Sequence, residues 1–404
     1  MSLQTALSGL DAAQTGLNTV SNDLANASTT AFKSQTSLFE DVYPTGETGV
    51  PGYGAATEGM DTNISQGGLT STGNGLDAAI QGNGYFVVSN NGTQQYTRDG
   101  AFKLSSDGTL QTLTGSSVMG YTGAATSGTL SALTVSTGAM KATASANLGV
   151  DLDLNSGDTQ IPATTAFNAA DATTYSESTS TVAYDSLGNA NTVKLYMVQN
   201  QATGGATPSW TVYAQPVTSA GTNVGSAQQL TTLNFNTDGT LASGSPATLN
   251  VNWGNGAANS ALSFNFAGTT LAAQSFAVAG LTNDGYAAGT YSGSSVNSSG
   301  QLVSTYSNGQ TITNGTLALA NFINPEGLQD VSGNLYASTN SSGVAVVNAP
   351  GNGQSGTVEG GYLEASNAST SSLLVSLIQY QQAYQADTSV LQTEQQDAQR
   401  LVQI

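Results

Sequence analysis

Two residue types that carry much of enzyme and metal chemistry are missing from this sequence. It contains no cysteine and no histidine among its 404 residues. Their absence excludes disulfides, thiolate metal sites, catalytic triads that use histidine and histidine-based proton transfer. Chemistry would therefore have to rest on carboxylates or on glycine-rich loops, and two segments resemble known sites of those kinds.

The first segment is "GNGQSG" at residues 351–356, which matches the pattern G-x-G-x-x-G of dinucleotide-binding loops. The preceding "VAVVN" has the composition of a strand, as such a loop requires. The following "TVEGGY" does not begin a helix, so the helix N-terminus that would hold a pyrophosphate is missing. We therefore interpret the segment as a flexible turn.

The second segment is "DLDLNSGD" at residues 151–158, which begins like a calcium-binding EF-hand loop. Its sixth position is Ser156 instead of glycine and its twelfth is Pro162 instead of glutamate, so the loop lacks its turn and its bidentate ligand. Acidic residues alternate here with Val150, Leu152 and Leu154, a pattern typical of a half-buried strand. The segment predicts a strand and no metal site.

Nothing else in the sequence selects a catalytic centre. Any two of the 25 acidic residues could form a carboxylate pair for glycoside hydrolysis, but no spacing points to one pair. The patterns G-x-S-x-G and G-x-x-x-x-G-K-[ST] are absent. We expect no enzymatic activity, no cofactor and no metal.

The clearest pattern is a heptad repeat at each end of the chain. Near the N-terminus, leucines recur every seven residues and small or apolar residues follow three positions later, which predicts a coiled-coil helix from about Ser2 to about Asn26. From about Ser369 a second helical pattern begins. The predicted seam consists of Leu3, Ala6, Leu10, Ala13, Leu17, Val20 and Leu24 in the first helix, and Leu373, Leu377, Tyr380, Tyr384, Leu391, Ala398 and Leu401 in the second.

The simplest topology pairs the two ends as an antiparallel or bundled set of helices. Gly9 and Gly16 each cost about 1 kcal/mol relative to alanine inside a helix, so the first helix is a poor folder alone. We expect both helices to be disordered in the free chain and to become ordered when several chains bring their ends together. An intramolecular helical hairpin remains the alternative.

Charge is unusually sparse. Only 8% of residues are charged, and the net charge is −19. Polar uncharged surfaces lose little solvation when they pack together, whereas nucleic acid and anionic lipid require basic patches. The first basic residue is Lys33, so no secretory signal peptide is expected, and the apolar run at 373–378 is too short for the ~18 residues of a membrane span. The composition favours protein–protein packing.

Between the helices, short runs of alternating residues separated by turn dipeptides predict β structure. We interpret 28–59 as an extended, partly ordered connector, and we read Asp99-Gly100, Asp107-Gly108, Asn308-Gly309 and Asn314-Gly315 as turns that close antiparallel strands. The predicted fold is mostly β with α-helical termini: a coiled-coil-like core of N- and C-terminal helices and two nested, discontinuous antiparallel β domains. The boundaries are 1–70 with 364–404 for the helical domain and connector, 71–145 with 286–363 for an inner β domain, and 146–285 for an outer inserted β domain.

Three segments carry a family resemblance. "ALSGLDAAQTGLNTVSNDLANASTTAFKSQ" at 6–35 resembles the opening of the axial proteins of the bacterial flagellum, and 66–110 and 361–393 resemble their first β segment and their C-terminal signature. The family usually has glycine where this chain has Ala31. The matching motif residues are Ser21, Asn22, Asp23, Leu24, Ala25, Asn26, Thr29, Phe32 and Lys33.

Within this group, the length and the large insertion resemble the hook-protein family. That resemblance implies a structural subunit, exported without a cleaved signal peptide, that polymerises into the curved extracellular tube joining motor to filament. It implies contact with other copies of the chain and with the distal rod, hook cap, hook-length control and hook–filament junction proteins. It implies neither nucleic acid binding nor membrane insertion. The alternatives are a distal rod protein, a secreted β-rich adhesin and an acidic β-rich hydrolase.

Overall fold

The computed structural model describes residues 3–43, 52–201 and 209–402. The chain divides into two compact units, each described here by itself. Unit 1 contains the described residues up to 137, together with 292–305 and those from 311 onward. Unit 2 contains residues 138–291 and 306–310.

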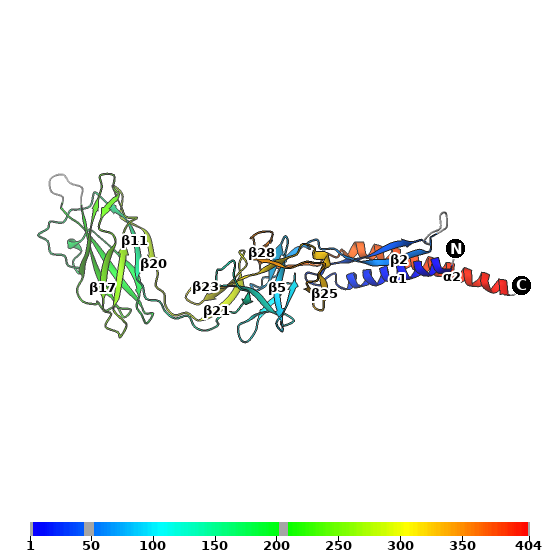
Figure 1. The fold of residues 1–404 in the computed structure, drawn as a ribbon. Coiled ribbons are helices and arrows are strands. Elements are labelled where there is room, and N and C mark those ends of the chain that lie inside the picture. Colours follow the sequence, from blue (N-terminus) through cyan, green and yellow to red (C-terminus); the bar gives the residue numbers. More distant parts are fainter. Residues whose placement is uncertain (1–2, 44–51, 202–208, 403–404) are drawn as a thin grey trace. The chain divides into compact units, whose positions relative to one another are not determined.

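Two long helices belong to unit 1: α1 spans Leu3–Ala25 and α2 spans Thr370–Val402. Figure 1 shows them side by side. Gly9 lies against Asp387 and Gly16 lies against Tyr380, so residue numbers rise along one helix as they fall along the other. The helices are therefore antiparallel, which confirms the predicted pairing of the two ends. The proposed cap Ser2 lies outside the described residues.

The segment after α1 forms a hairpin, so the prediction of a partly ordered connector was wrong where the structure describes it. Strand β1 (Gln35–Val42) pairs antiparallel with β2 (Gly54–Thr62), with a register shift between Leu38 and Phe39. The hydroxyl oxygens of Thr19 and Ser37 are 2.7 Å apart and tie β1 to α1. Residues 44–51 of the predicted connector lie outside the described part of the chain.

The remaining strands of unit 1 form one large, mainly antiparallel sheet and two short pairs, β28 with β4 and β29 with β3. The main path of the large sheet is β21-β22-β23-β9-β5-β6-β26-β25. The bounds are β3 Leu69–Ser71, β4 Ala78–Gln81, β5 Tyr85–Asn90, β6 Thr93–Thr97, β7 Phe102–Leu104, β8 Leu110–Thr112, β9 Ser117–Thr122, β10 Ser131–Ala132, β21 Tyr291–Val296, β22 Gln301–Tyr306, β23 Thr311–Leu317, β24 Leu319–Asn321, η2 Pro325–Gly327, β25 Gln329–Val331, β26 Leu335–Ala337, β27 Val346–Asn348, β28 Thr357–Gly360 and β29 Tyr362–Glu364.

Aromatic side chains dominate one core of this sheet. Tyr96 and Phe322 meet edge to face with ring centroids 4.8 Å apart, and Tyr85 contacts Phe322 and Tyr336 in the same manner. Such edge-to-face pairs add about 0.5–1.5 kcal/mol each beyond the burial of their surface. The core joins β5 and β6 to residues more than two hundred positions later, so the sheet cannot form from its N-terminal strands alone.

Two of the four predicted turns close hairpins. Gly108 has a positive φ of 81° in the loop between β7 and β8, and Gly309 has one of 78° in the loop between β22 and β23. The other two predictions were wrong. Gly100 follows β6 without reversing the chain and packs against the carbonyl of Ala78, and Gly315 lies inside β23, where it pairs with Leu302.

A stronger turn signal was overlooked in the sequence. Asn91 and Gly92, with φ of 51° and 85°, form the two-residue connection between β5 and β6. Such connections require positive φ at both positions, which asparagine and glycine tolerate best. "GNGQSG" lies in the loop between β27 and β28 and no helix follows it, as predicted.

Unit 2 consists of two five-stranded sheets, with strand orders β17-β18-β11-β19 (β20 also pairing with β11) and β12-β13-β14-β15-β16. The pairing is antiparallel except that β11 runs parallel to β18 and β19, which the prediction of antiparallel domains missed. The bounds are β11 Asn147–Asn155, η1 Ala172–Thr174, β12 Glu177–Tyr184, β13 Ala190–Gln199, β14 Trp210–Val217, β15 Gln228–Phe235, β16 Leu241–Ser243, β17 Ala247–Val251, β18 Ser260–Asn265, β19 Thr270–Ala272 and β20 Ala277–Asn283.

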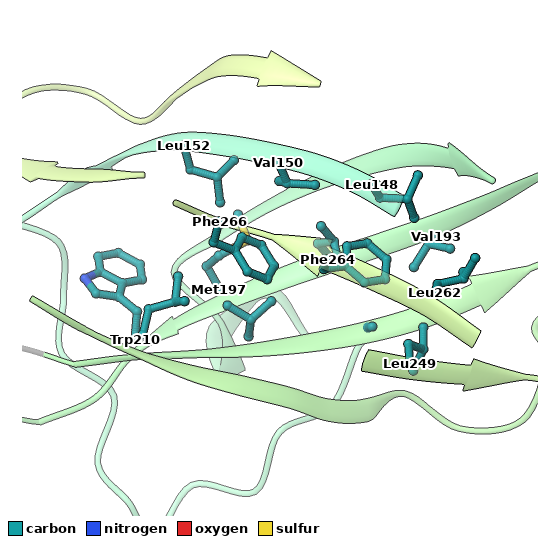
Figure 2. Packing of buried hydrophobic residues seen from close by; sticks show 14 of the residues in the cluster. Leu148, Val150, Leu152, Val193, Met197, Trp210, Leu249, Leu262, Phe264 and Phe266 are labelled. Carbon is teal, nitrogen blue, oxygen red and sulfur yellow. The ribbon is translucent and has the colours of Figure 1, made fainter. Parts of the chain in front are cut away.

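The two sheets of unit 2 share one apolar core (Figure 2). Along β11 every second side chain is fully buried, starting at Leu148 and ending at Leu154. This alternation confirms the predicted strand for residues 151–155, whereas residues 156–158 form a turn after β11, and it is typical of sheets packed face to face. Trp210 and Phe264 contribute large buried side chains from the two sheets.

A buried carboxylate organises the turn between β12 and β13. Asp185 is fully buried and accepts hydrogen bonds from the side-chain amides of Asn189, Asn191 and Asn255. Burial alone would raise the pKa of Asp185, but these amides and the Asn189 backbone hold the pKa at about 2. The turn therefore fixes a charged carboxylate without using a basic residue.

Candidate functional site

The antiparallel helical pair is the first candidate site, and the small residues of the predicted seam are its buried part. Ala6, Ala13 and Val20 are buried in α1. The larger seam residues are less enclosed: Leu10, Leu17 and Leu24 are half-buried and Leu3 is exposed. In α2 the half-buried seam residues are Leu373, Leu377, Tyr380, Tyr384 and Leu391. Ala398 is exposed, and the side chain of Leu401 lies outside the described residues.

The two glycines of α1 explain how the helices approach so closely. A Cβ atom on Gly16 would overlap the ring of Tyr380, and one on Gly9 would lie 2.7 Å from an oxygen of Asp387. Gly16 is therefore a notch into which the Tyr380 ring fits. In the sequence these glycines predict only a loss of helix stability, although their spacing of seven residues also indicates a packing role.

Several large apolar side chains point away from the helical pair. Their exposed fractions range from 46% to 56%, although side chains of this kind gain about 1.5–3 kcal/mol each from complete burial. Residues 370–386 of α2 contain no charged residue. We call this set the outward apolar residues: Leu3, Leu7, Leu374, Val375 and Ile378. They leave the pair with apolar surface that a neighbouring chain could cover.

The family motif after the seam is divided between solvent and interior. Its exposed members are Ser21, Asn22 and Ala25, its half-buried members are Leu24, Asn26, Thr29 and Phe32, and its buried members are Asp23, Ala31 and Lys33. The Asp23 carboxylate accepts the backbone N–H of Gln35 at 3.0 and 3.2 Å. Burial raises the pKa of Asp23, and this hydrogen bond partly opposes the shift.

Ala31 occupies the position where the family usually has glycine, and its backbone explains that preference. Its φ is +57°, in the left-handed region that costs L-residues about 1–2 kcal/mol. The Ala31 N–H donates to the carbonyl of Glu364 at 2.8 Å, which joins the N-terminal motif to the segment before α2. The chain therefore accepts strain here in order to make this contact.

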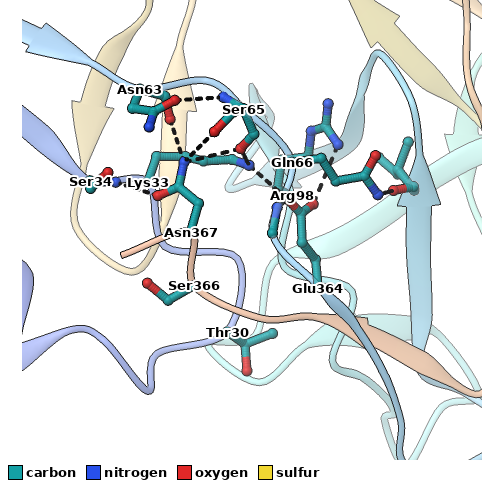
Figure 3. Close-up of polar contacts among 12 residues, drawn as sticks. Thr30, Lys33, Ser34, Asn63, Ser65, Gln66, Arg98, Glu364, Ser366 and Asn367 are labelled. Atoms are coloured by element: carbon teal, nitrogen blue, oxygen red, sulfur yellow. Dashed lines mark hydrogen bonds and ion pairs between the residues drawn. The ribbon is translucent and has the colours of Figure 1, made fainter. Parts of the chain in front are cut away.

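A buried charge cluster lies at the same junction (Figure 3). Glu364 is fully buried, and its Oε1 accepts from Lys33 Nζ at 2.6 Å while its Oε2 accepts from Arg98 Nη1 at 3.3 Å. The Gly67 N–H donates to Oε1 at 2.9 Å, and Lys33 also donates to the carbonyl of Ser65 at 2.7 Å. One carboxylate therefore holds four segments that are far apart in the sequence.

Each buried charge of the cluster is paired with an opposite charge within the cluster. Burial lowers the pKa of Lys33, whereas the hydrogen bond and the negative charge of Glu364 oppose that shift. Arg98 also donates to the carbonyl of Gly82 at 2.8 Å and lies over the Tyr85 ring at 5.4 Å. Removing one partner from such a buried pair leaves an unpaired charge and costs about 3–5 kcal/mol.

Asn367 completes the junction by bonding through both ends of its amide. Its Oδ1 accepts the backbone N–H of Ser34 at 2.8 Å, and its Nδ2 donates to the carbonyls of Asn63 at 2.7 Å and Ser65 at 3.0 Å. Neither Asn367 nor Glu364 was assigned a role from the sequence, although both lie in the C-terminal signature. The sequence offered one signal, which is that the chain has only six basic residues. Two of them, Lys33 and Arg98, are buried, and buried cations require an acidic partner.

The contacts of the charge cluster and of Asn367 join segments that are distant in the sequence. Within the described ranges, no group of three or more acidic residues is placed to hold a metal ion. Nor is any described helix long and apolar enough to cross a membrane.

Comparison with known families assigns successive parts of the chain to flagellar domains. Residues 3–33 match the family described as flagella basal body rod protein, and residues 359–404 match the flagellar basal body rod FlgEFG protein C-terminal family. Residues 79–165 match the flagellar hook protein FlgE/F/G D1 domain, and residues 151–286 match the flagellar basal body protein FlaE D2 domain. Together these matches include both helices, part of the sheet of unit 1 and most of unit 2.

Full-length relatives agree with these assignments. The flagellar hook protein FlgE of Escherichia coli K12 is 34% identical, and that of Salmonella typhimurium LT2 is 33% identical, each over 100% of both chains. The crystal structure of Helicobacter pylori flagellar hook protein FlgE2 shares the fold with a TM-score of 0.56 at 14% identity, covering 73% of this chain and 100% of that chain. From its terminal motifs to its inserted domain, the chain belongs to the flagellar hook protein FlgE family.

Proposed function

We propose that this chain is the structural subunit of a bacterial flagellar hook, which polymerises into a curved helical tube and transmits torque from motor to filament as a universal joint. Family membership over the whole chain supports a hook subunit over a distal rod protein, because the relatives match the insertion as well as both ends. The proposal includes no enzymatic step.

The observation that carries the proposal is the helical pair with its outward apolar residues. Ala6, Ala13 and Val20 are buried in α1, whereas the outward apolar residues of the two helices remain about half exposed. Neighbouring copies would bury this surface. A contact between different faces of identical subunits builds an open helical assembly when its rotation does not close into a ring.

Low charge suits a joint that bends while it turns. Each subunit in a curved rotating tube must change its axial contacts repeatedly at small cost. Surfaces built from serine, threonine, asparagine and glycine contain few ion pairs that must be broken and desolvated during such movement. Only 8% of the residues of this chain are charged. The composition therefore supports sliding contacts between subunits.

The sequence-based domains supply the layers of the proposed tube. Residues 1–70 and 364–404 would form the inner polymerisation domain, 71–145 and 286–363 the inner β domain, and 146–285 the outer β domain. The seam and motif residues would act in the inner layer. The subunit would meet the distal rod, hook cap, hook-length control and hook–filament junction proteins at the ends of the tube, after export without a cleaved signal peptide.

Hydrogen exchange on purified chain tests the polymerisation role. Amide exchange at both ends is measured before and after salt-induced polymerisation, in the intact chain and in a chain lacking residues 1–30. We expect the amides of both terminal helices of the intact chain to exchange more slowly in the polymer than in the monomer, while the shortened chain keeps a folded unit 2 and does not polymerise. Ends equally protected in the monomer and the polymer would show that the helical pair acts only as an intramolecular hairpin, and would reopen the adhesin and hydrolase alternatives.

A further inference from the structure

An exposed apolar surface occurs in unit 1 away from the helical pair. Ile323 is 90% exposed, Val344 is 84% exposed and Val346 is 56% exposed. We call these three residues the knob. Isolated exposed apolar residues are common on proteins, but clusters on the surface mark contact sites.

The fold brings the knob residues together. Strands β24 and β27 pair antiparallel with Asn321 opposite Val346, and Ile323 follows two residues after Asn321. Ile323 and Val346 line the same cavity of about 400 Å³. The side chains alternate along each segment, because Phe322 is buried where Ile323 is exposed.

The loops that present the knob are fastened to one another. The Asn324 side chain donates to the carbonyl of Ser341 at 3.2 Å, and its backbone N–H donates to the carbonyl of Ser342 at 3.3 Å. Ser342 is fully buried and its hydroxyl donates to the carbonyl of Thr339 at 3.0 Å. The knob is therefore held in position before any partner arrives, which reduces the entropy lost on binding.

Charge identifies the partner. The chain has a net charge of −19, so two copies repel one another wherever acidic residues face each other. Around the knob the sequence is neutral: residues 315–325 and 331–358 contain no charged residue, and Glu326 and Asp330 lie between these segments. A basic partner would require acidic residues within the contact. A second copy of this chain requires the uncharged surface that the knob provides.

We propose that the knob is a contact between neighbouring copies of this chain in the polymer. This inference rests on the proposed function. It adds a second adhesive surface in the inner β domain, distinct from the outward apolar residues of the helical pair. Its apolar side chains become buried when the next copy packs against them.

The absence of cysteine makes a direct test possible, because a single introduced thiol is unique in the chain. Ile323→Cys is compared with Leu113→Cys, whose parent side chain is 61% exposed in the same unit. Labelling by a maleimide is followed in the monomer and after salt-induced polymerisation. We expect the thiol at 323 to be labelled at least tenfold more slowly in the polymer, and the thiol at 113 to change by less than threefold.

A second pair of variants measures the contribution to assembly. Ile323→Asp should raise the concentration needed for polymerisation more than tenfold, because it places a charge in an apolar contact. Leu113→Asp should leave that concentration within threefold of the parent. Far-UV circular dichroism, which follows α1 and α2 of the same unit, checks that both variants are folded.

The outcomes separate the two proposals. If the parent chain forms no polymer, the proposed function fails and this inference fails with it. If the parent polymerises but the thiol at 323 remains as reactive as in the monomer, the knob contact is overturned and the proposed function stands. Equal protection at 323 and 113 would also overturn it, because the protection would then be unspecific.

Discussion

Replacing Glu364 by glutamine tests whether the buried charge cluster fastens the terminal segments of unit 1 to the rest of that unit. The substitution preserves the shape of the side chain but removes the only carboxylate that contacts Lys33 and Arg98 in the described structure. Both cations would then lie in the interior without a counter-charge. We expect the free energy of unfolding of unit 1 to fall by about 3–5 kcal/mol.

The two units can be followed separately in one denaturation experiment. The two tryptophans of the chain, Trp210 and Trp253, both lie in unit 2, whereas α1 and α2 belong to unit 1. Far-UV circular dichroism therefore follows the helices, and tryptophan fluorescence follows unit 2. In the Glu364→Gln variant the helical signal should be lost at a lower denaturant concentration while the fluorescence transition stays in place.

Two further variants sharpen the interpretation. Glu359→Gln removes the same charge from a half-buried position on β28 and should change stability by less than about 1 kcal/mol. Adding Lys33→Met to Glu364→Gln removes one of the unpaired cations and should recover part of the loss. If Glu364→Gln changes the free energy of unfolding of unit 1 no more than Glu359→Gln does, the charge cluster does not stabilise unit 1 as its geometry indicates.

Three other predictions follow from described features. Gly16→Ala should lower the stability of the helical pair by about 1–3 kcal/mol in denaturant melts, because the added methyl group meets the Tyr380 ring. Alanine favours helix over glycine, so an unchanged or higher stability would show that the ring does not require glycine at position 16. Ala31→Val should cost about 2 kcal/mol or more by the same measurement, since β-branched residues tolerate a positive φ poorly, whereas Ala31→Gly should change stability by less than about 1 kcal/mol. Because the pKa of Asp185 is lowered from 3.8 to about 2, its contribution to the stability of unit 2 is complete above about pH 4 and is lost as the pH falls through 2. Fluorescence-detected melts should show a loss of about 2 kcal/mol that Asp185→Asn abolishes.

The sequence predicted the helices and the general β character well, because periodicity reports directly on which side chains must be buried. It failed where burial depends on contacts between distant segments. No local sequence pattern indicates that the ring of Tyr380 requires a glycine at position 16. Nor does any local pattern indicate that Gly315 lies within a strand and not in a turn. The parallel pairing of β11 with β18 likewise requires knowledge of which strands become neighbours.

For the candidate sites too, local repeats could be predicted from the sequence and contacts between distant segments could not. The seam could be located from its repeat, and the structure buries its small residues, but polymerisation through the seam stays a prediction. The role of Lys33 depended on Glu364, a partner 331 positions away, which no spacing rule could supply. The knob could not be found because Ile323 lies in an ordinary mixture of polar and apolar residues, and only the exposed surface distinguishes it.

The long separation between Lys33 and Glu364 also sets an order of events for a newly made chain. Unit 2 is nearly continuous in sequence, so its two sheets can close soon after residue 291 has been synthesised. Unit 1 must wait, because Glu364 and the strands beside it are among the last tenth or so of the chain to appear, and closing so large a loop is slow. A nascent chain would thus carry a folded unit 2 while α1 still lacks α2 and Lys33 still lacks Glu364, and the paired helices that we propose for polymerisation form only when the chain is complete.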